Sequence, residues 1–300
     1  EFEFSLTVML CEVAPSFGLL GLWATLTALG LLSQLFFSGS VFLMSYVNPT
    51  FEMWRFKLNP EYPTADMVRD EIIQMLKGLV AATIPPTLSI YLANKGMTHG
   101  YCGFGDHTAA YTAFSFAVVF FGTDFVEWGY HQLGHRYSSM WEIHRHHHKF
   151  YNPTPFAVIA DEWVDQIARA TPLLVFPLVL PVNMDMLFFT YVLLFYGYGT
   201  YLHWGYELDI GCAREMKYLY GSYEHYLHHA ISIKNKPLHT GFFLKLWDYL
   251  ADSVDKGKCR CSKCERDAGK RTREQWDKLK KPDYSPLLQP DFWLKGFKAE

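Results

Sequence analysis

Residues 124–156 read DFVEWGYHQLGHRYSSMWEIHRHHHKFYNPTPF, and six of the chain's thirteen histidines fall in this stretch. His131 and His135 are four residues apart, so a helix would place them one turn apart on the same face. A further motif, H-x-x-H-H, comprises His144, His147 and His148. Its offsets of three and four also predict convergence on one helical face. Five neutral imidazoles on one side of an apolar segment need a partner for their lone pairs, and a transition metal is a suitable one.

A second H-x-x-H-H motif occurs downstream, and one isolated histidine ends an apolar run. The nine histidines predicted as metal ligands are His131, His135, His144, His147, His148, His203, His225, His228 and His229. A structural zinc ion takes four ligands, so nine ligands predict two metal ions. His146 points away from its neighbours on a helix and is not predicted as a ligand, whereas metal binding by His239 is left open.

Long uncharged runs occupy much of the remaining chain. Half of the 300 residues are hydrophobic, and the net charge of −3 gives no general attraction to nucleic acid. Residues 13–51 contain no charged side chain, and this length is about twice the roughly 20 apolar residues that span a bilayer. The run predicts one long tilted helix or a hairpin turning near residues 38–40. Four further apolar runs cover residues 78–94, 107–123, 170–184 and 186–206.

These runs predict an all-α, polytopic membrane protein with about four to five transmembrane helices under a cytosolic histidine-rich helical cap. The run at 107–123 continues as a helix through His131, and the last two runs form an antiparallel pair that returns His203 to the same side. Eleven Lys and Arg residues between positions 256 and 281 follow on that side. The positive-inside rule therefore predicts a cytosolic cap and C-terminal tail, with Cys102 on the opposite side.

The six cysteines are scattered and predict no secreted disulfide framework. The last three, Cys259, Cys261 and Cys264, form C-x-C-x-x-C in the basic tail. Zinc binding there is left open, because the sequence gives no evident fourth ligand. Asp124, seven residues before His131, is predicted to be a carboxylate partner of a metal-bound histidine. An interfacial carboxylate with no metal role is the alternative.

Nine nitrogen ligands beside a bilayer suit the activation of O2 for the oxidation of a lipid, and iron supports that chemistry where zinc does not. The order of histidine motifs resembles the fatty acid hydroxylase / sterol desaturase superfamily. The segment NPTPFA at residues 152–157, the pair Val164-Asp165 and Trp247-Asp248 are similar to its sterol C-5 desaturase (lathosterol oxidase) branch. The resemblance covers about residues 108–252. It implies a catalytic domain there, between an N-terminal transmembrane and linker region (1–107) and a basic cytosolic tail (253–300).

The resemblance also implies an enzyme of the endoplasmic reticulum membrane that holds two iron ions, although zinc is possible after overexpression. Its oxidant is O2, and electrons come from cytochrome b5 and NAD(P)H through a reductase. The chain has no G-x-G-x-x-G dinucleotide fingerprint, so it needs such an external donor. The expected reaction is desaturation or hydroxylation of a sterol or triterpenoid in lipid biosynthesis.

Three positions depart from the branch pattern. Glu162-Trp163 replaces His-Pro, residues 235–241 read NKPLHTG instead of containing Asn-Tyr-Gly, and Ala251-Asp252-Ser253 replaces Gly-Thr. Glu162 is predicted to contact a polar group of the substrate or to stand in for a family histidine beside the metal. Squalene epoxidation and fatty-acyl or ceramide hydroxylation remain alternatives. A metal transporter and a non-catalytic metal-binding membrane protein are alternatives of another class.

Overall fold

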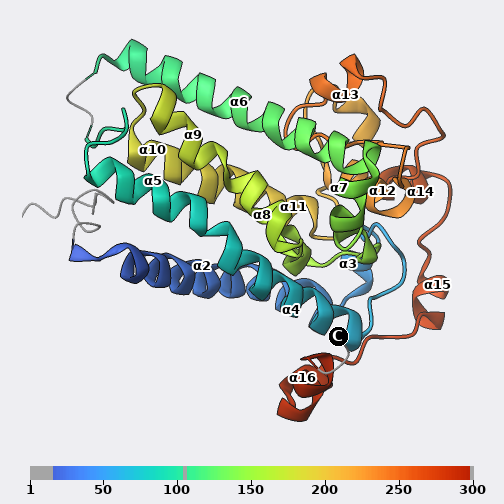
Figure 1. Cartoon of the computed structure of the whole chain (residues 1–300). Helices are drawn as coiled ribbons and strands as arrows, with labels where there is room; N and C mark the ends of the chain where they lie inside the picture. Colours follow the sequence, from blue (N-terminus) through green and yellow to red (C-terminus); the bar gives the residue numbers. More distant parts are fainter. Residues whose placement is uncertain (1–15, 104–106, 298–300) are drawn as a thin grey trace, which may run out of the picture.

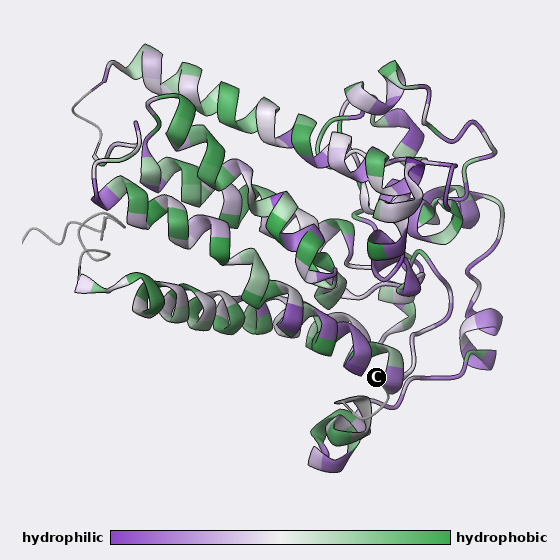
Figure 2. Ribbon diagram, in the orientation of Figure 1, coloured by the Kyte–Doolittle hydropathy of each residue, from purple (hydrophilic) through white to green (hydrophobic). Residues whose placement is uncertain are grey.

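The computed structural model describes residues 16–103 and 107–297. Within these residues the elements are helices, and the β-type pairing consists of isolated bridges, which confirms the prediction of an all-α protein. Long helices run along the molecule, and short helices gather at one end (Figure 1). Figure 2 shows hydrophobic residues along the long helices and more hydrophilic residues at the short-helix end, as expected for a membrane bundle under a cap.

Three helical segments of the described residues are long and apolar enough to cross a membrane. They are α2 with the π-helix η2 (Leu19–Phe42 and Leu43–Val47), α4 with α5 (Ala65–Ala82 and Ile84–Asn94), and α6 (Ala109–Arg136). The first passes through residues 38–40 without turning, so the hairpin alternative is wrong. Its most apolar window is only 17% buried, as expected of a lipid-facing helix.

Prolines shape two of the membrane-embedded elements. Pro85 and Pro86 occupy the first turn of α5, where the missing N–H groups have no helical partner to lose, and α4 meets α5 at Thr83. The predicted antiparallel pair follows α8 (Trp163–Ala170) and consists of short pieces. Its first part is α9 (Pro172–Val179), which begins at Pro172 and contains Pro177. Its second part comprises α10 (Met184–Phe189), the π-helix η5 (Thr190–Tyr196) and α11 (Gly197–Leu202). The chain turns at residues 180–183, between α9 and α10, where the predicted runs 170–184 and 186–206 meet. The total of four to five spans remains a prediction.

Short helices and loops build the cap. They are α3 (Phe51–Trp54), α7 (Ser138–His144), η3 (His147–Lys149), η4 (Pro155–Ile159), η6 (Ala213–Glu215), α12 (Ser222–Ile231), α13 (Leu246–Leu250), α14 (Ser262–Asp267), α15 (Arg273–Lys278), η7 (Ser285–Leu288) and α16 (Pro290–Phe297). The loop between α5 and α6 lies at the opposite end of the bundle (Figure 1). Cys102 in this loop is disulfide-bonded, which its spacing in the sequence did not predict.

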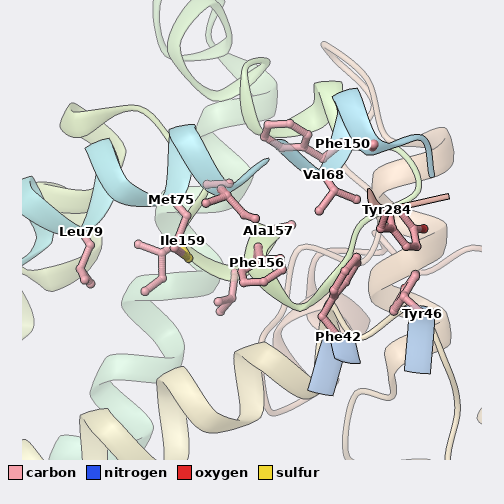
Figure 3. Packing of buried hydrophobic residues seen from close by; sticks show 14 of the residues in the cluster. Phe42, Tyr46, Val68, Met75, Leu79, Phe150, Phe156, Ala157, Ile159 and Tyr284 are labelled. Carbon is pink, nitrogen blue, oxygen red and sulfur yellow. The ribbon is translucent and has the colours of Figure 1, made fainter. Parts of the chain in front are cut away.

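The largest hydrophobic cluster joins the cap to the membrane bundle. Phe156 and Ile159 of η4 lie between α2, which contributes Phe42, and α4, which contributes Met75 (Figure 3). Tyr284 from the tail packs edge-on against Phe42, with ring centroids 4.9 Å apart. Helix η4, which follows the histidine motif, is therefore held by α2 and α4, and Tyr284 of the tail packs into the same cluster.

Candidate metal centre

The end of α6 delivers the first two histidines. Thr108 caps the helix by accepting a hydrogen bond from the N–H of Tyr111, and the helix then runs for 28 residues. His131 and His135 lie in its last two turns, beyond the apolar run. Their rings point toward the same space, with centroids 5.4 Å apart. The helical spacing argument therefore holds for this pair.

The first H-x-x-H-H motif does not form one helical face. Helix α7 ends at His144, a turn follows at Arg145 and His146, and a separate 3-10 helix begins at His147. The expectation of convergence on one face is wrong here, because it assumed a continuous helix. The break allows His147 to point away from His144 and His148.

The nine predicted ligands fall into two groups, in each of which the ligand atoms lie within 4.8 Å of one another. The first group contains His131, His135, His144, His148 and His228. The second group contains His147, His203, His225 and His229. Each H-x-x-H-H motif therefore contributes to both groups, and helix α12 supplies ligands to each of them. This division supports two metal ions rather than one.

Distances between ring nitrogens match those of ligands that share an ion. The Nε2 atoms of His203 and His225 are 2.9 Å apart, those of His148 and His228 are 3.1 Å apart, and those of His147 and His203 are 3.4 Å apart. With metal–nitrogen bonds of about 2.1 Å, bond angles of 90–109° separate neighbouring nitrogens by about 3.0–3.4 Å. The groups therefore have the spacing of coordination spheres.

Hydrogen bonds fix the orientation of several rings. The Nδ1 atoms of His131, His203 and His228 lie 3.0, 2.8 and 2.6 Å from the backbone oxygens of Thr240, Gly199 and Leu238. A carbonyl accepts only, so each Nδ1 carries the proton and each Nε2 has a free lone pair. Buried ring nitrogens without a protein partner in the described part of the chain include His131 Nε2, His135 Nε2, His144 Nε2 and both nitrogens of His229. Orphaned buried acceptors of this kind fit a bound metal.

Burial favours the neutral state that metal binding requires. It lowers the pKa of His148, His225, His228 and His229 well below the ordinary value, and neighbouring histidines lower it further. Neutral imidazole is the form that ligates a metal, so binding does not need to displace a proton at neutral pH.

Two carboxylates contact the metal-binding histidines. Asp161 Oδ1 is 2.7 Å from His147 Nδ1, and Asp165 Oδ2 is 3.4 Å from His144 Nδ1. Arg169 contacts Asp161 at 2.6 Å. Burial alone would raise the pKa of Asp161, but His147 and Arg169 hold it well below its usual range. Carboxylates in this position orient a ligand ring and increase its basicity.

Sequence reasoning gave no role to Asp161 and used Asp165 only for the family resemblance. A signal was present: Asp161, Asp165 and Arg169 are spaced by four residues in a segment with few other charges. Such spacing predicts one helical face. In the structure Asp165 and Arg169 lie on α8 and Asp161 lies just before it, and the two carboxylates contact His144 and His147.

The two predicted catalytic carboxylates have other contacts. Asp124 accepts hydrogen bonds from the backbone N–H of Phe243 and from the indole N–H of Trp247, both at 2.8 Å. Glu162 lies 3.1 Å from Nδ1 of His146, a residue outside the two groups. Asp124 therefore positions the segment before α13. Catalytic roles for both carboxylates remain predictions.

His239 is also outside both groups, although it is buried. Its Nε2 accepts a hydrogen bond from the backbone N–H of Asp255 at 3.1 Å. That contact gives one ring nitrogen a protein partner in place of a metal.

An apolar cavity of about 790 Å³ lies between α2, the helices α4 and α5, and the segment formed by α10, η5 and α11. Its lining includes Leu29 and Phe37 of α2, Leu79 of α4, and Tyr191 and Tyr196 of η5. A small cavity that shares Tyr191 and Tyr196 with it also reaches Glu127, Arg169 and Phe242. These last three residues in turn line a space walled by His131, His144, His147, His203 and His225. The cavities thus form a series from the membrane bundle to the histidines.

Residues 116–253 match the fatty acid hydroxylase family model. The match begins inside α6 and ends just after α13, so it includes all nine histidines of the two groups.

Curated relatives are sterol-modifying enzymes. The chain is 28% identical to lathosterol oxidase of Mus musculus over 193 residues, which are 63% of this chain and 61% of the relative. It is also 28% identical to the Delta(7)-sterol 5(6)-desaturase of Leptosphaeria maculans over 177 residues, 57% of this chain and 44% of the relative. The chain thus matches less than two thirds of the length of these relatives. No solved structure matches the chain significantly.

Proposed function

Starting from a fatty acid hydroxylase region at residues 116–253, we propose that the protein is a membrane-bound, non-haem di-iron oxidoreductase. It uses O2 to desaturate or hydroxylate a sterol or triterpenoid lipid. The observation that carries the proposal is the pair of histidine groups, together with small cavities that share lining residues with one another and with an apolar cavity in the membrane bundle.

Iron held by the two groups would supply the activation of O2 that oxidation of an unactivated C–H bond requires. The protein's own residues set the geometry of this site. Thr240, Gly199 and Leu238 hold the Nδ1 protons of His131, His203 and His228 through their carbonyl groups, so that the Nε2 lone pairs face inward. Such preorganisation is what a metal site in a dry cavity needs.

The cavity supports a bulky apolar substrate. Its volume falls within the ~300–1,000 Å³ typical of ligand pockets, and its walls are mainly hydrophobic and aromatic. The route from it to the histidines passes Tyr196 and then Phe242, whose side chains would exclude water from the reacting carbon. A sterol or triterpenoid is the first choice because the curated relatives act on sterols.

Electrons come from cytochrome b5 and an NAD(P)H-dependent reductase, and the membrane is that of the endoplasmic reticulum. The basic segment between residues 256 and 281 supports a cytosolic cap, which would face these soluble donor domains. The disulfide at Cys102, at the far end of the bundle, supports an oxidising lumen on that side.

The rival of a metal transporter is disfavoured by the position of the histidines. Transport sites lie near the middle of the membrane on broken helices. Here the metal-binding histidines of α6 lie in its last turns, at the end of the bundle where the cap gathers (Figure 1).

The direct test supplies microsomes containing the protein with lathosterol-type sterols, squalene and long-chain ceramides, together with NADH and cytochrome b5. We expect an oxidised sterol or triterpenoid, and loss of the product in His147→Ala and in His228→Ala. These two changes remove one ligand from each group. Product that disappears in both variants is therefore made by this protein and not by other microsomal enzymes. Purified protein from iron-replete cells should show a di-iron Mössbauer signal.

Each alternative predicts its own result in this assay. Oxidation of ceramides or free acyl chains alone would overturn the substrate class but leave the iron chemistry intact. An epoxide of squalene would identify the epoxidase alternative. Full activity of either histidine variant would remove the di-iron hypothesis, and a metal-loaded protein without turnover on any lipid would favour a non-catalytic role.

A further inference from the structure

We infer that Cys212, Cys259, Cys261 and Cys264 form a structural zinc site, separate from the histidine groups. In the sequence, C-x-C-x-x-C of the tail lacks a fourth ligand. The fold supplies one, because Cys212 from the loop before α12 meets the tail cysteines although it is 47 residues from Cys259. The four sulfur atoms lie within 4.8 Å of one another.

The sulfur distances fit a tetrahedral site. Cys212 Sγ is 3.6 Å from Cys259 Sγ, 3.3 Å from Cys264 Sγ and 3.6 Å from Cys261 Sγ. Four sulfurs at about 2.3 Å from a central zinc would be about 3.8 Å apart. A disulfide would require about 2.05 Å, and all four cysteines are free.

Backbone N–H groups reach two of the four sulfur atoms. The N–H groups of Ala213 and Cys264 reach the sulfur of Cys261, and the N–H of Arg214 reaches the sulfur of Cys212. Hydrogen bonds from backbone N–H groups stabilise the negative charge of a metal-bound sulfur. Cys261 also precedes the first turn of α14, so Cys264 lies one turn further along that helix.

Four thiolates select the metal. A tetrahedral sulfur site is typical of zinc or iron–sulfur centres, and a closed set of four ligands is typical of structural zinc. The set has no histidine or carboxylate member, whereas the two groups of the candidate metal centre contain only histidines. The thiolate ligands would therefore bind zinc, while the histidine groups bind the other two metal ions.

The zinc site would lie against the side of α12 that faces away from the histidine groups. Tyr223 and Leu227 of α12 belong to the same apolar cluster as the four cysteines, while His225, His228 and His229 occupy the other side of that helix. Tyr223 Oη accepts a hydrogen bond from the N–H of Arg260, between two of the cysteines. Zinc would therefore fasten the tail to the helix that supplies ligands to both histidine groups.

The first experiment uses the unmodified full chain, purified in detergent from cells supplied with iron and zinc. Titration with p-hydroxymercuribenzoate, which releases thiolate-bound zinc, should free one zinc ion per chain to a chromogenic chelator. X-ray absorption at the zinc edge should give a sulfur shell at about 2.3 Å. Absence of releasable zinc, a shell of nitrogen alone, or iron in the sulfur shell would overturn the inference.

Substitutions then test which residues bind the releasable zinc ion. Cys264→Ser should lose the releasable zinc and leave the metal content of the histidine groups unchanged, and His225→Ala should do the reverse. Ser262→Ala, within the same segment, should change neither. The tail of Cys264→Ser should also be cut faster by trypsin after residue 258. Retention of one mercurial-releasable zinc in both Cys212→Ser and Cys264→Ser would contradict the site. If a variant does not fold, zinc release and X-ray absorption of the unmodified chain still test the site.

Discussion

Five histidines in the two groups have a neighbour that contacts the ring nitrogen facing away from the group. Backbone carbonyls serve His131, His203 and His228, whereas the carboxylates Asp161 and Asp165 serve His147 and His144. A carbonyl is fixed by the fold and cannot be altered by substitution. The two carboxylates can be altered, and each faces a different group.

Asp161→Asn should weaken metal binding by the group of His147 about 10–100-fold, because an amide replaces the charge that orients this ring. Asp165→Asn should affect the group of His144 instead. Metal retained after dialysis against a graded chelator series measures both effects. Glu162→Gln, a matched change beside a histidine outside the groups, should leave retention unchanged. Wild-type retention by Asp161→Asn would show that this carboxylate does not support the metal.

His239 should make the protein less stable in acid. Burial lowers its pKa to about 4, against about 6.5 in an unfolded chain. Between these values the unfolded state binds more protons, so stability falls as pH falls, by about 2 kcal/mol at pH 5. His239→Asn removes the titration, and asparagine tolerates the positive φ of 53°.

The measurement compares the unfolding midpoint of the detergent-solubilised protein at pH 7 and pH 5. The decrease should be smaller in His239→Asn than in the unmodified chain, and metal content at pH 7 should be equal. Histidines of the metal groups titrate in both proteins, so the difference isolates His239. Equal decreases in the two proteins would contradict the prediction.

At the scale of elements, the cap is held by buried polar contacts in its loops. Asp248 of α13 accepts hydrogen bonds from Tyr220 Oη and from the N–H of Gly241, both at 2.6 Å. It also accepts one from the side chain of Thr240, whose carbonyl holds His131. Gly241 has to be glycine, because a Cβ there would come within 2.3 Å of the ring of Tyr220. Loop residues between α12 and α13 thus set the position of a histidine on α6.

The membrane cavity gives a prediction for α2. Ser33 lines this cavity, while its neighbour Leu32 is 66% exposed on the lipid-facing side. Ser33→Phe should fill part of the cavity and reduce turnover of the sterol or triterpenoid substrate on the order of tenfold, about 1.4 kcal/mol. Leu32→Phe should not change it. Product formation in microsomes is the readout, with equal metal content in both variants. Unchanged turnover in Ser33→Phe would place the substrate elsewhere.

Long elements could be predicted from the sequence, and their breaks could not. The uncharged run at 107–123 continues as α6 through His131 and His135, as predicted, because length and apolarity are local properties. The helix break after His144 depends on contacts with the rest of the cap, so spacing rules assigned the H-x-x-H-H motif to one face. The distribution of nine histidines over two groups follows from that break and from the fold of α12. Cys212 was missed for the same reason, since its partners are distant in the chain.

For the whole molecule, orientation is the main open prediction. Lys256 of the cap region and Met97 of the α5–α6 loop are exposed, with 74% of the former side chain and 65% of the latter residue accessible. In sealed microsomes an impermeant thiol reagent should label Lys256→Cys. It should label Met97→Cys only after detergent is added. The reverse pattern would contradict a cytosolic cap.

The length of helix α6 gives an expected depth for the histidine groups in the membrane. Its 28 residues extend about 42 Å, and His131 lies about 33 Å from its start, whereas the hydrocarbon layer is about 30 Å thick. With the start of α6 at the far edge of the hydrocarbon and the helix along the membrane normal, we expect the histidine groups near headgroup level rather than in the hydrocarbon. A lipid that lies in the leaflet with its polar end at that level would present bonds close to this end first. We expect oxidation to favour carbons near the polar end of the substrate, and positions at its far end to be out of reach.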